Sequence, residues 1–136
     1  MIFVDTGPLY ARYVPGDQHH IAARDGWDRL RQSRSELITT NHVIDESVTL
    51  LARRTSYAFA HQRGAVWLQS SDLRVESTRR DDGIEALRWF RKFADQSVIF
   101  TDAVSFAVMT RLGLTTAFTF DRHFELAGFE TLAGER

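Results

Sequence analysis

Short apolar segments alternate with longer segments of helical periodicity along the chain. The short segments predict strands at residues 1–5, 36–40, 73–76, 98–100, 117–120 and about 129–132. Apolar positions spaced three and four residues apart predict helices over 18–32, 41–51, 56–70, 82–93 and 102–112, with a helical turn near 122–126. A further helix can begin at Thr6-Gly7-Pro8, because proline suits the first helical position.

Local signals mark the ends of some of these helices. Asn41 is a favoured N-cap for the helix that follows it, and Gly113 is a favoured C-cap for the helix that precedes it. The helices over 41–51 and 56–70 are close enough in sequence to form a hairpin. The 82–93 helix carries an apolar stripe at three-residue steps, formed by Ile84, Leu87, Phe90 and Phe93.

Strands and helices alternate throughout, which predicts an α/β fold with a mostly parallel central sheet and helices on both faces, in three α/β/α layers. The chain has 136 residues, of which 43% are hydrophobic and 26% charged, and it contains no repeat or linker, so we expect a single domain over 1–136. No apolar run approaches the about 18 residues of a membrane span, and the N-terminus lacks the pattern of a signal peptide. We therefore expect a cytoplasmic protein that does not contact a membrane.

Composition narrows the chemistry. The chain has no cysteine, which excludes disulfides, thiolate metal ligands and a cysteine nucleophile. Its formal net charge of -1 argues against binding a polyanion through the field of the whole molecule. Lys92 is the only lysine, and the many arginines suit bidentate phosphate contacts, although genome composition could produce the same bias. Catalysis would have to use oxygen or imidazole groups.

Four acidic residues fall where predicted strands end or where the following helices begin. They are Asp5, Glu46, Asp102 and Asp121. Taken singly, each could be a turn or cap residue, or could be favoured by the positive end of a helix dipole. The carboxyl ends of parallel strands, however, meet at one edge of the sheet, where folds of this class bind ligands. We therefore expect the four side chains to meet in one pocket.

A cluster of this kind needs a counter-charge. Carboxylates about 4 Å apart repel each other by roughly 4 kcal/mol per pair at an effective dielectric constant of about 20. Mg²⁺ and Mn²⁺ prefer oxygen ligands and would remove the conflict. Such a site suits phosphodiester hydrolysis, because a divalent metal activates water, orients the phosphate and stabilises the leaving oxygen.

Four segments, in this order, resemble the PIN domain family and, within it, the VapC-like toxin ribonucleases of toxin–antitoxin pairs: FVDTGPLYA, NHVIDESVTLL, FTDAVSFAVM and TFDRHFELAGFE. The resemblance covers essentially the whole chain and implies a PIN-like domain that cleaves RNA endonucleolytically. It implies that the catalytic and Mg²⁺- or Mn²⁺-binding residues are Asp5, Glu46, Asp102 and Asp121. It also implies a homodimer, and an antitoxin protein that occupies the groove near the active site. The choice of RNA over DNA rests on the resemblance alone.

Several residues around these acids have more than one interpretation. Glu46 is preferred over its neighbour Asp45 because the family's motif places the glutamate after a hydrophobic-X pair. Thr6 and Thr101 could add hydroxyls to the water shell of a metal, or could simply cap helices. Solvated surface is the alternative for the arginines that could contact phosphate, which are Arg12, Arg53, Arg54 and Arg122.

The histidines have bland interpretations beside their possible functional ones. His19 and His20 are interpreted as a solvated helix start, and His123 as a residue that orients substrate or covers a turn. His42 and Glu46 are four residues apart on one helix and could hold zinc, but no third imidazole lies at a ligand spacing nearby.

Other functions remain open from the sequence. A signalling receiver also places acids at strand ends, but it needs a lysine near the site, and Lys92 follows a helical stripe instead of ending a strand. A metal-binding interaction module without turnover fits the same acids. So does a PIN-fold RNA-processing nuclease outside a toxin–antitoxin pair.

Overall fold

A parallel sheet lies at the centre of the computed structural model, which describes residues 1–132. Residues 133–136, the end of the expected domain, lie outside the described part. The five strands found there follow the spatial order β3-β2-β1-β4-β5, and every neighbouring pair is parallel. Their bounds are β1 (Ile2–Val4), β2 (Leu37–Thr40), β3 (Leu73–Glu76), β4 (Thr116–Phe118) and β5 (Glu130–Thr131).

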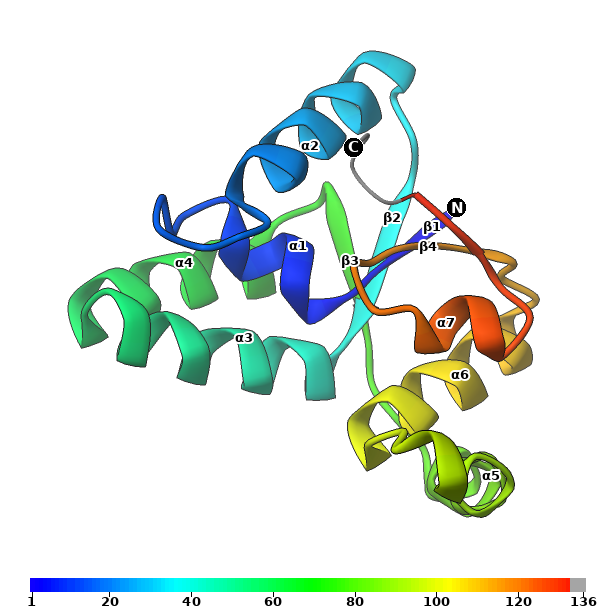
Figure 1. The fold of residues 1–136 in the computed structure, drawn as a ribbon. Coiled ribbons are helices and arrows are strands. Elements are labelled where there is room, and N and C mark those ends of the chain that lie inside the picture. Colours follow the sequence, from blue (N-terminus) through cyan, green and yellow to red (C-terminus); the bar gives the residue numbers. More distant parts are fainter. Residues whose placement is uncertain (133–136) are drawn as a thin grey trace.

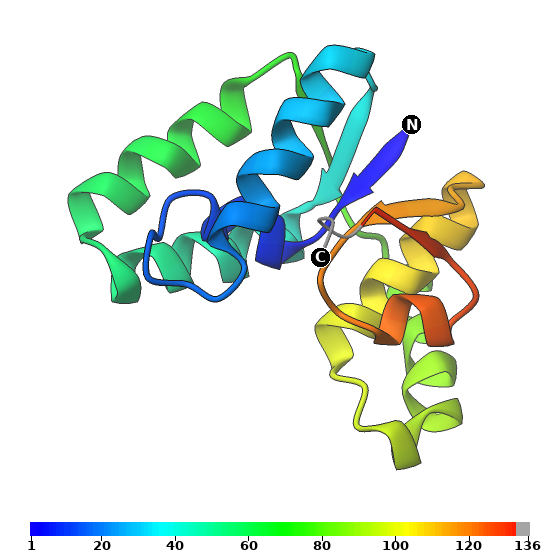
Figure 2. The same cartoon turned by 45° about the horizontal axis from the view of Figure 1, so that its top comes forward.

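Helices cover both faces of this sheet. The described helices are α1 (Thr6–Ala11), α2 (His20–Ser33), α3 (Asn41–Arg54), α4 (Tyr57–Gln69), α5 (Arg80–Lys92), α6 (Phe100–Leu112) and α7 (His123–Leu126), with a 3-10 turn at Ala94–Gln96. Helices α1 to α4 lie on one side and α5 to α7 on the other (Figures 1 and 2). This division follows from right-handed crossovers, because the chain steps from β1 to β3 in one direction and from β4 to β5 in the other.

The structure confirms the predicted α/β/α class, the hairpin of α3 and α4, and Gly113 as the C-cap of α6 in a left-handed conformation. Within residues 1–132, no helix combines the length and the apolar character needed to cross a membrane.

The predicted strand at 98–100 is wrong. Ser97 adopts a left-handed conformation, Val98 is buried, and α6 already begins at Phe100. The N–H of Ala103 donates to the carbonyl of Ile99 at 3.1 Å, so this apolar run enters a helix. Both sides of β1 are taken by β2 and β4, which leaves no place beside β1 for another strand.

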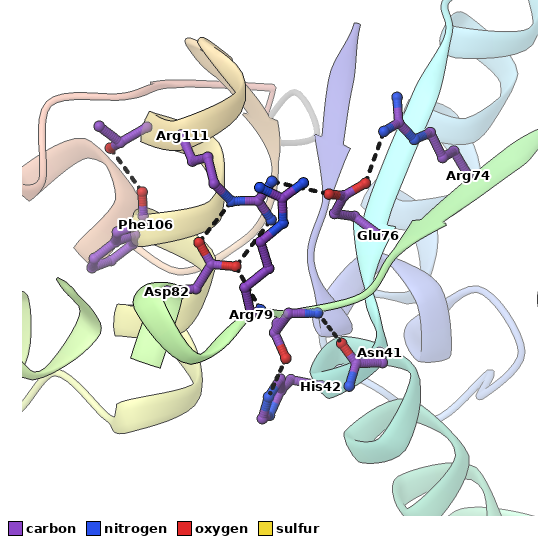
Figure 3. A network of polar contacts seen from close by, with 10 residues as sticks. Asn41, His42, Arg74, Glu76, Arg79, Asp82, Phe106 and Arg111 are labelled. Carbon is purple, nitrogen blue, oxygen red and sulfur yellow. Dashed lines mark hydrogen bonds and ion pairs between the residues drawn. The ribbon is translucent and has the colours of Figure 1, made fainter. Parts of the chain in front are cut away.

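The predicted N-cap of α3 is also wrong by one residue. The Thr40 hydroxyl accepts a hydrogen bond from the N–H of Val43 at 3.2 Å and caps the helix. Asn41 instead accepts from the N–H of Thr78 at 3.0 Å, which ties α3 to the segment between β3 and α5 (Figure 3). Thr40 therefore caps the helix, and the neighbouring Asn41 makes a tertiary contact instead.

Most of the predicted apolar stripe does not face the core, since of its four residues only Phe93, just after α5, packs against it. Ile84 and Leu87 are each 57% exposed and Phe90 is 42% exposed, whereas the buried side of the helix carries Asp82 and Ala86. An ion pair between Asp82 and Arg111 replaces the expected apolar contact on the buried side of α5. The guanidinium of Arg111 on α6 donates to both carboxylate oxygens of Asp82, at 2.7 and 2.9 Å (Figure 3).

The same guanidinium links α6 to the sheet. Arg111 donates to Glu76 at the end of β3 at 3.1 Å, and Arg74 donates to the other oxygen of Glu76 at 2.8 Å. These charge-assisted bonds keep the pKa of Glu76 below its usual range, since they outweigh its desolvation by burial. The network fixes α5 and α6 against the edge of the sheet.

Candidate active site

The acidic residues lie at the point where the chain changes direction across the sheet. The adjacent strands β1 and β4 lead into connections on opposite faces, so their carboxyl ends open a crevice. Asp5 directly follows β1, and Asp121 follows β4 by three residues. Helix α3 brings Glu46 from one face, and the first turn of α6 brings Asp102 from the other. One acid therefore arrives from each of four separate elements.

These four side chains line a single cavity of about 480 Å³. Asp5 and Asp102 are 7% and 5% exposed, while Glu46 and Asp121 are half-buried. The convergence expected from the sequence is therefore present. The full lining is Asp5, Thr6, Gly7, His19, Glu46, Ile99, Asp102, Phe120, Asp121 and Arg122.

Two threonines hold the acids in place. The Thr6 hydroxyl, in the first turn of α1, donates to Glu46 at 2.6 Å. The buried Thr119 hydroxyl donates to Asp5 at 2.7 Å and accepts from the backbone N–H of Asp121 at 3.0 Å. Each carboxylate bonded in this way keeps one oxygen free of that contact. The threonines thus orient the acids without neutralising them.

Burial makes two of the acids reluctant to ionise. Desolvation raises the pKa of Asp102 to about 9, reinforced by the charge of Asp5, a hydrogen bond with Asp121 and the charge of Glu46. Desolvation also raises the pKa of Asp5 to about 6, although hydrogen bonds from Thr119 and the Thr6 backbone oppose the shift. Protonated Asp102 can therefore donate to its neighbour at neutral pH.

Asp121 behaves in the opposite way. Burial disfavours its ionised form, but hydrogen bonds from Asp102 and from the N–H of His123 outweigh this and lower its pKa. The Nδ1 of His123 lies 2.9 Å from a carboxylate oxygen of Asp121, and its Nε2 lies 2.8 Å from the carbonyl oxygen of Gln96. His123 therefore orients Asp121, whereas the sequence had left open whether it orients substrate or covers a turn.

The donor set fits a divalent cation. Ligand atoms of Asp102, Asp121 and His123 all lie within 4.8 Å of one another, and Asp5 and Glu46 line the same cavity. The raised pKa values show that this arrangement disfavours ionised Asp5 and Asp102 while no cation is bound. A hard cation would remove that penalty, because it prefers charged oxygen ligands.

Other residues considered from the sequence lie outside this cavity. Asp45 is exposed on α3 and, with Thr101, lines a second cavity of about 370 Å³ that shares only Glu46 with the first. His42 lines the second cavity too, and its Nε2 lies 3.0 Å from the Thr78 hydroxyl, so it does not join Glu46 in a zinc site.

The candidate arginines are spread over several places. Arg122 lines the acidic cavity and Arg53 lines the second cavity. Arg54 pairs with Asp17 at 3.5 Å, and the Arg12 guanidinium lies over the ring of Trp27 at 4.7 Å. Only the first two are therefore placed beside the acids.

Sequence reasoning did not assign the non-acidic residues Gly7, Ile99 and Phe120 to the cavity, nor Thr119 to its support. Thr119 and Phe120 follow β4 directly in Phe118-Thr119-Phe120-Asp121, so their place before the acid could have found them. His19, interpreted as a solvated helix start, instead faces the cavity. No pattern around His19 shows this, because the loop before α2 folds back toward β4 only in the tertiary structure.

The fold and the cavity together define an α/β protein with an acidic ligand site at the switch point of its sheet. The family model of the PIN domain matches residues 2–130, and the chain belongs to this family. This confirms the resemblance drawn from the four sequence segments and removes the signalling receiver from consideration.

Two comparisons point to the same relative. The chain is 37% identical to the 23S rRNA-specific endonuclease VapC20 of two Mycobacterium tuberculosis strains, over 129 residues that cover 95% of each chain. The crystal structure of Mycobacterium tuberculosis VapC20, described as a sarcin-ricin loop cleaving toxin, matches with a TM-score of 0.86 and 36% identity. That match covers 98% of this chain and 99% of the other.

More distant structures share the fold. VapBC2 from Rickettsia felis, bound to a fragment of its promoter DNA, matches with a TM-score of 0.69 at 11% identity, covering 97% of this chain and 98% of that chain. FitAcB from Neisseria gonorrhoeae matches with a TM-score of 0.70 at 16% identity, covering 97% and 96%. At these identities the likeness concerns the fold alone.

Proposed function

We propose that this protein is a metal-dependent endoribonuclease and the toxin of a type II toxin–antitoxin pair. The single observation that carries the proposal is the convergence of Asp5, Glu46, Asp102 and Asp121 in one cavity at the switch point of the sheet. The 37% identity to an rRNA endonuclease over nearly the whole chain supports the same reaction, with ribosomal RNA as the substrate class.

Asp5, Glu46, Asp102 and Asp121 would hold Mg²⁺ or Mn²⁺. When bound, such a cation supplies Lewis-acid stabilisation of phosphate charge and lowers the pKa of water. The chain's own residues supply the rest. Thr6 orients Glu46, while Thr119 and His123 orient Asp5 and Asp121. A free carboxylate oxygen of this set accepts the proton of the attacking water, and the products carry a 5′-phosphate and a 3′-hydroxyl.

The substrate path follows from the two cavities. They share Glu46 as a common wall, with Arg122 in the first and Arg53 in the second. The planar guanidinium of arginine can donate two parallel hydrogen bonds to phosphate oxygens. A strand that passes over Glu46 would therefore meet acids at its centre and a cation on each side, which offsets the repulsion between the acids and the phosphates despite the net charge of -1.

The proposal includes two protein partners. VapBC2 and FitAcB, whose fold this chain shares, support a cognate antitoxin. Its place over the acidic cavity is what the resemblance to VapC-like toxins implies. We also propose a homodimer. The exposed apolar stripe of α5, together with Phe100, which is 40% exposed and lies edge-on to Phe90 at 5.8 Å, supports self-association through this face.

Cleavage of ribosomal RNA by the purified protein tests the nuclease proposal. We expect cleavage with Mg²⁺ or Mn²⁺, no cleavage with EDTA, and products with 5′-phosphate ends. Asp102→Asn should lower the rate about 100-fold or more, because it removes one charged ligand of the site.

Asp25→Asn is the matched control, since Asp25 is exposed on α2 and lines neither the acidic cavity nor the second cavity. It should cleave like the wild type. If the wild type binds Mg²⁺ but cleaves no RNA under these conditions, the protein is a metal-binding module instead. If Asp102→Asn cleaves as fast as the wild type, the assignment of the site is wrong.

A further inference from the structure

One wall of the acidic cavity is aromatic. His19 and Phe120 line it with their rings stacked, the centroids 4.5 Å apart and the planes inclined by 15°. Ile99 and the exposed Arg122 line the same cavity. Neither His19 nor Phe120 has a hydrogen bond to the four acids among the contacts found in residues 1–132. Orienting the acids does not explain the pair.

The surrounding structure holds the backbone of His19 and the ring of Phe120 in place. The backbone N–H of His19 donates to Asp17 at 2.8 Å, and the Tyr10 hydroxyl donates to the other oxygen of Asp17 at 2.8 Å. Phe120 packs edge-on against Phe118 at 5.9 Å. The stacked pair is therefore a preformed surface.

A glycine makes room for this surface. A Cβ atom at Gly7 would lie 3.1 Å from the Phe120 ring, which is tighter than ordinary van der Waals contact. Gly7 lies in the first turn of α1, directly after Asp5 and Thr6. The aromatic wall thus packs against the same turn that carries part of the acidic wall, so one ligand can reach both.

The two walls call for a ligand with two kinds of group. The acids and their cation suit a phosphate, whereas a flat aromatic surface suits a planar ring. Single-stranded RNA carries a phosphate and a base on every nucleotide. Its unpaired bases commonly stack on Phe, Tyr, Trp or His side chains. An antitoxin peptide would place an aromatic side chain at this wall only if its sequence carried one at that position.

We propose that His19 and Phe120 form a nucleobase subsite, on which the base next to the scissile phosphate stacks. This inference rests on the proposed nuclease function and adds to it a reason for cleavage at unpaired nucleotides. Arg122, which lines the same cavity, would contact the phosphate of that nucleotide.

Kinetics with abasic substrates test the subsite. A stem–loop RNA that the wild type cleaves is compared with versions that lack one base on either side of the cleaved bond. Loss of the stacked base should raise KM about tenfold with little change in kcat, whereas the other abasic position should have a smaller effect. His19→Ala should raise KM for the intact RNA by a similar factor and leave KM for the sensitive abasic RNA unchanged.

Two variants complete the design. His19→Phe keeps a planar ring and should restore KM to within about threefold of the wild type. His61→Ala removes an exposed histidine on α4, away from the cavity lining, and should match the wild type throughout.

The outcomes separate the two levels of inference. If wild type cleaves no RNA, the proposed function fails. If it cleaves intact and abasic RNAs with equal KM, or if His19→Ala matches the wild type, the nucleobase subsite is wrong and the nuclease proposal stands. If His19→Ala lowers kcat for all RNAs equally and His19→Phe does not restore it, His19 is only a structural residue.

Discussion

Asp102 lies in the first turn of α6, a helix that is otherwise largely buried. Its neighbours on α6 from Ala103 to Met109 are all buried, and the carboxyl group itself is 5% exposed. Such a position is costly for a charge, and burial accordingly raises its pKa to about 9. The residue is therefore held in the fold in its protonated form unless a cation is bound. This is a site at which stability opposes the proposed activity.

Asp102→Asn should separate the two properties. At pH 7 the unfolded chain ionises Asp102 freely while the folded chain must keep it protonated, so this residue favours unfolding. In EDTA, Asp102→Asn should raise the free energy of unfolding by about 1 to 4 kcal/mol, although we expect the same variant to lose most of its cleavage with Mg²⁺. Urea denaturation measures this.

Asp121→Asn provides the comparison within the same cavity. The pKa of Asp121 is lowered in the folded protein, so its ionised form favours folding. This variant should not gain stability in EDTA. Equal effects of the two substitutions would contradict the assignment of opposite shifts.

At the scale of elements, the helices pack at positions that local pattern does not reveal. Gly26 of α2 is buried against Phe118 of β4, and a Cβ atom at this glycine would lie 2.4 Å from the Phe118 ring. Phe118 is itself fully buried, so its ring would have to shift within the core to admit a Cβ atom. The close approach of α2 to the sheet therefore requires glycine at this position.

Gly26→Ala should destabilise the protein by about 1 to 3 kcal/mol, because overpacking outweighs the better helix propensity of alanine. Gly83→Ala on α5 is the matched control. A Cβ atom there meets nothing within 4 Å, so this variant should gain about 0.5 to 1 kcal/mol. Urea midpoints of the two variants decide the matter. A stabilised Gly26→Ala variant would show that α2 packs less closely than described.

Helix α5 shows why a stripe can mislead. The periodicity of Ile84, Leu87 and Phe90 correctly predicts a helix, but the buried side carries Asp82 and Ala86. Periodicity reports which residues share a face and not which neighbour that face meets. Arg111, 29 positions away in the chain, neutralises Asp82 and makes its burial possible. This partner could not be assigned from local sequence.

At the scale of the molecule, the acidic cavity couples folding to pH and metal. Folding raises the pKa of Asp102 from its ordinary value of 3.8 to about 9 and the pKa of Asp5 from 3.8 to about 6, mainly because both carboxyl groups are buried. A raised pKa means that the folded state binds more protons than the unfolded state. The resulting stability is fully present at pH values below the ordinary pKa and is lost as the pH rises through the raised pKa.

In EDTA, the free energy of unfolding should therefore fall between pH 6 and pH 9, by no more than about 1.4 kcal/mol per pH unit from Asp102. Mg²⁺ should oppose the loss and stabilise the protein more at pH 9 than at pH 6, since it competes with protons for the same oxygens. Scanning calorimetry at several pH values measures both effects. Asp102→Asn should flatten the pH dependence; an unchanged slope in this variant would overturn the explanation.

The exposed stripe of α5 yields a prediction about assembly. Leu87→Arg should leave stability within about 0.5 kcal/mol of the wild type, because Leu87 is exposed. It should, however, convert the proposed homodimer to monomer in light scattering. Ile21→Arg, on the opposite side of the molecule at a position 73% exposed, should leave the assembly unchanged. A dimer that survives Leu87→Arg would exclude this face as the interface.

The sequence by itself determined the class of fold and the residue types of the site. Alternating strands and helices require a parallel sheet, and the carboxyl ends of such strands share one edge, so Asp5 and Asp121 were expected to meet. Glu46 and Asp102 follow from the start of the next helices, even though the strand assigned before Asp102 does not form. These inferences depend on local geometry and on connection rules, both of which the sequence carries.

Only the tertiary structure decided which side chains complete the cavity and how each acid titrates. His19 lines the cavity because the loop before α2 folds back toward the end of β4, and Thr119 reaches Asp5 because β4 pairs with β1. Asp102 and Asp121 are the same residue type, yet their pKa values shift in opposite directions. The physical reason is that burial and hydrogen-bond partners are properties of contacts between distant segments, and no local pattern encodes them.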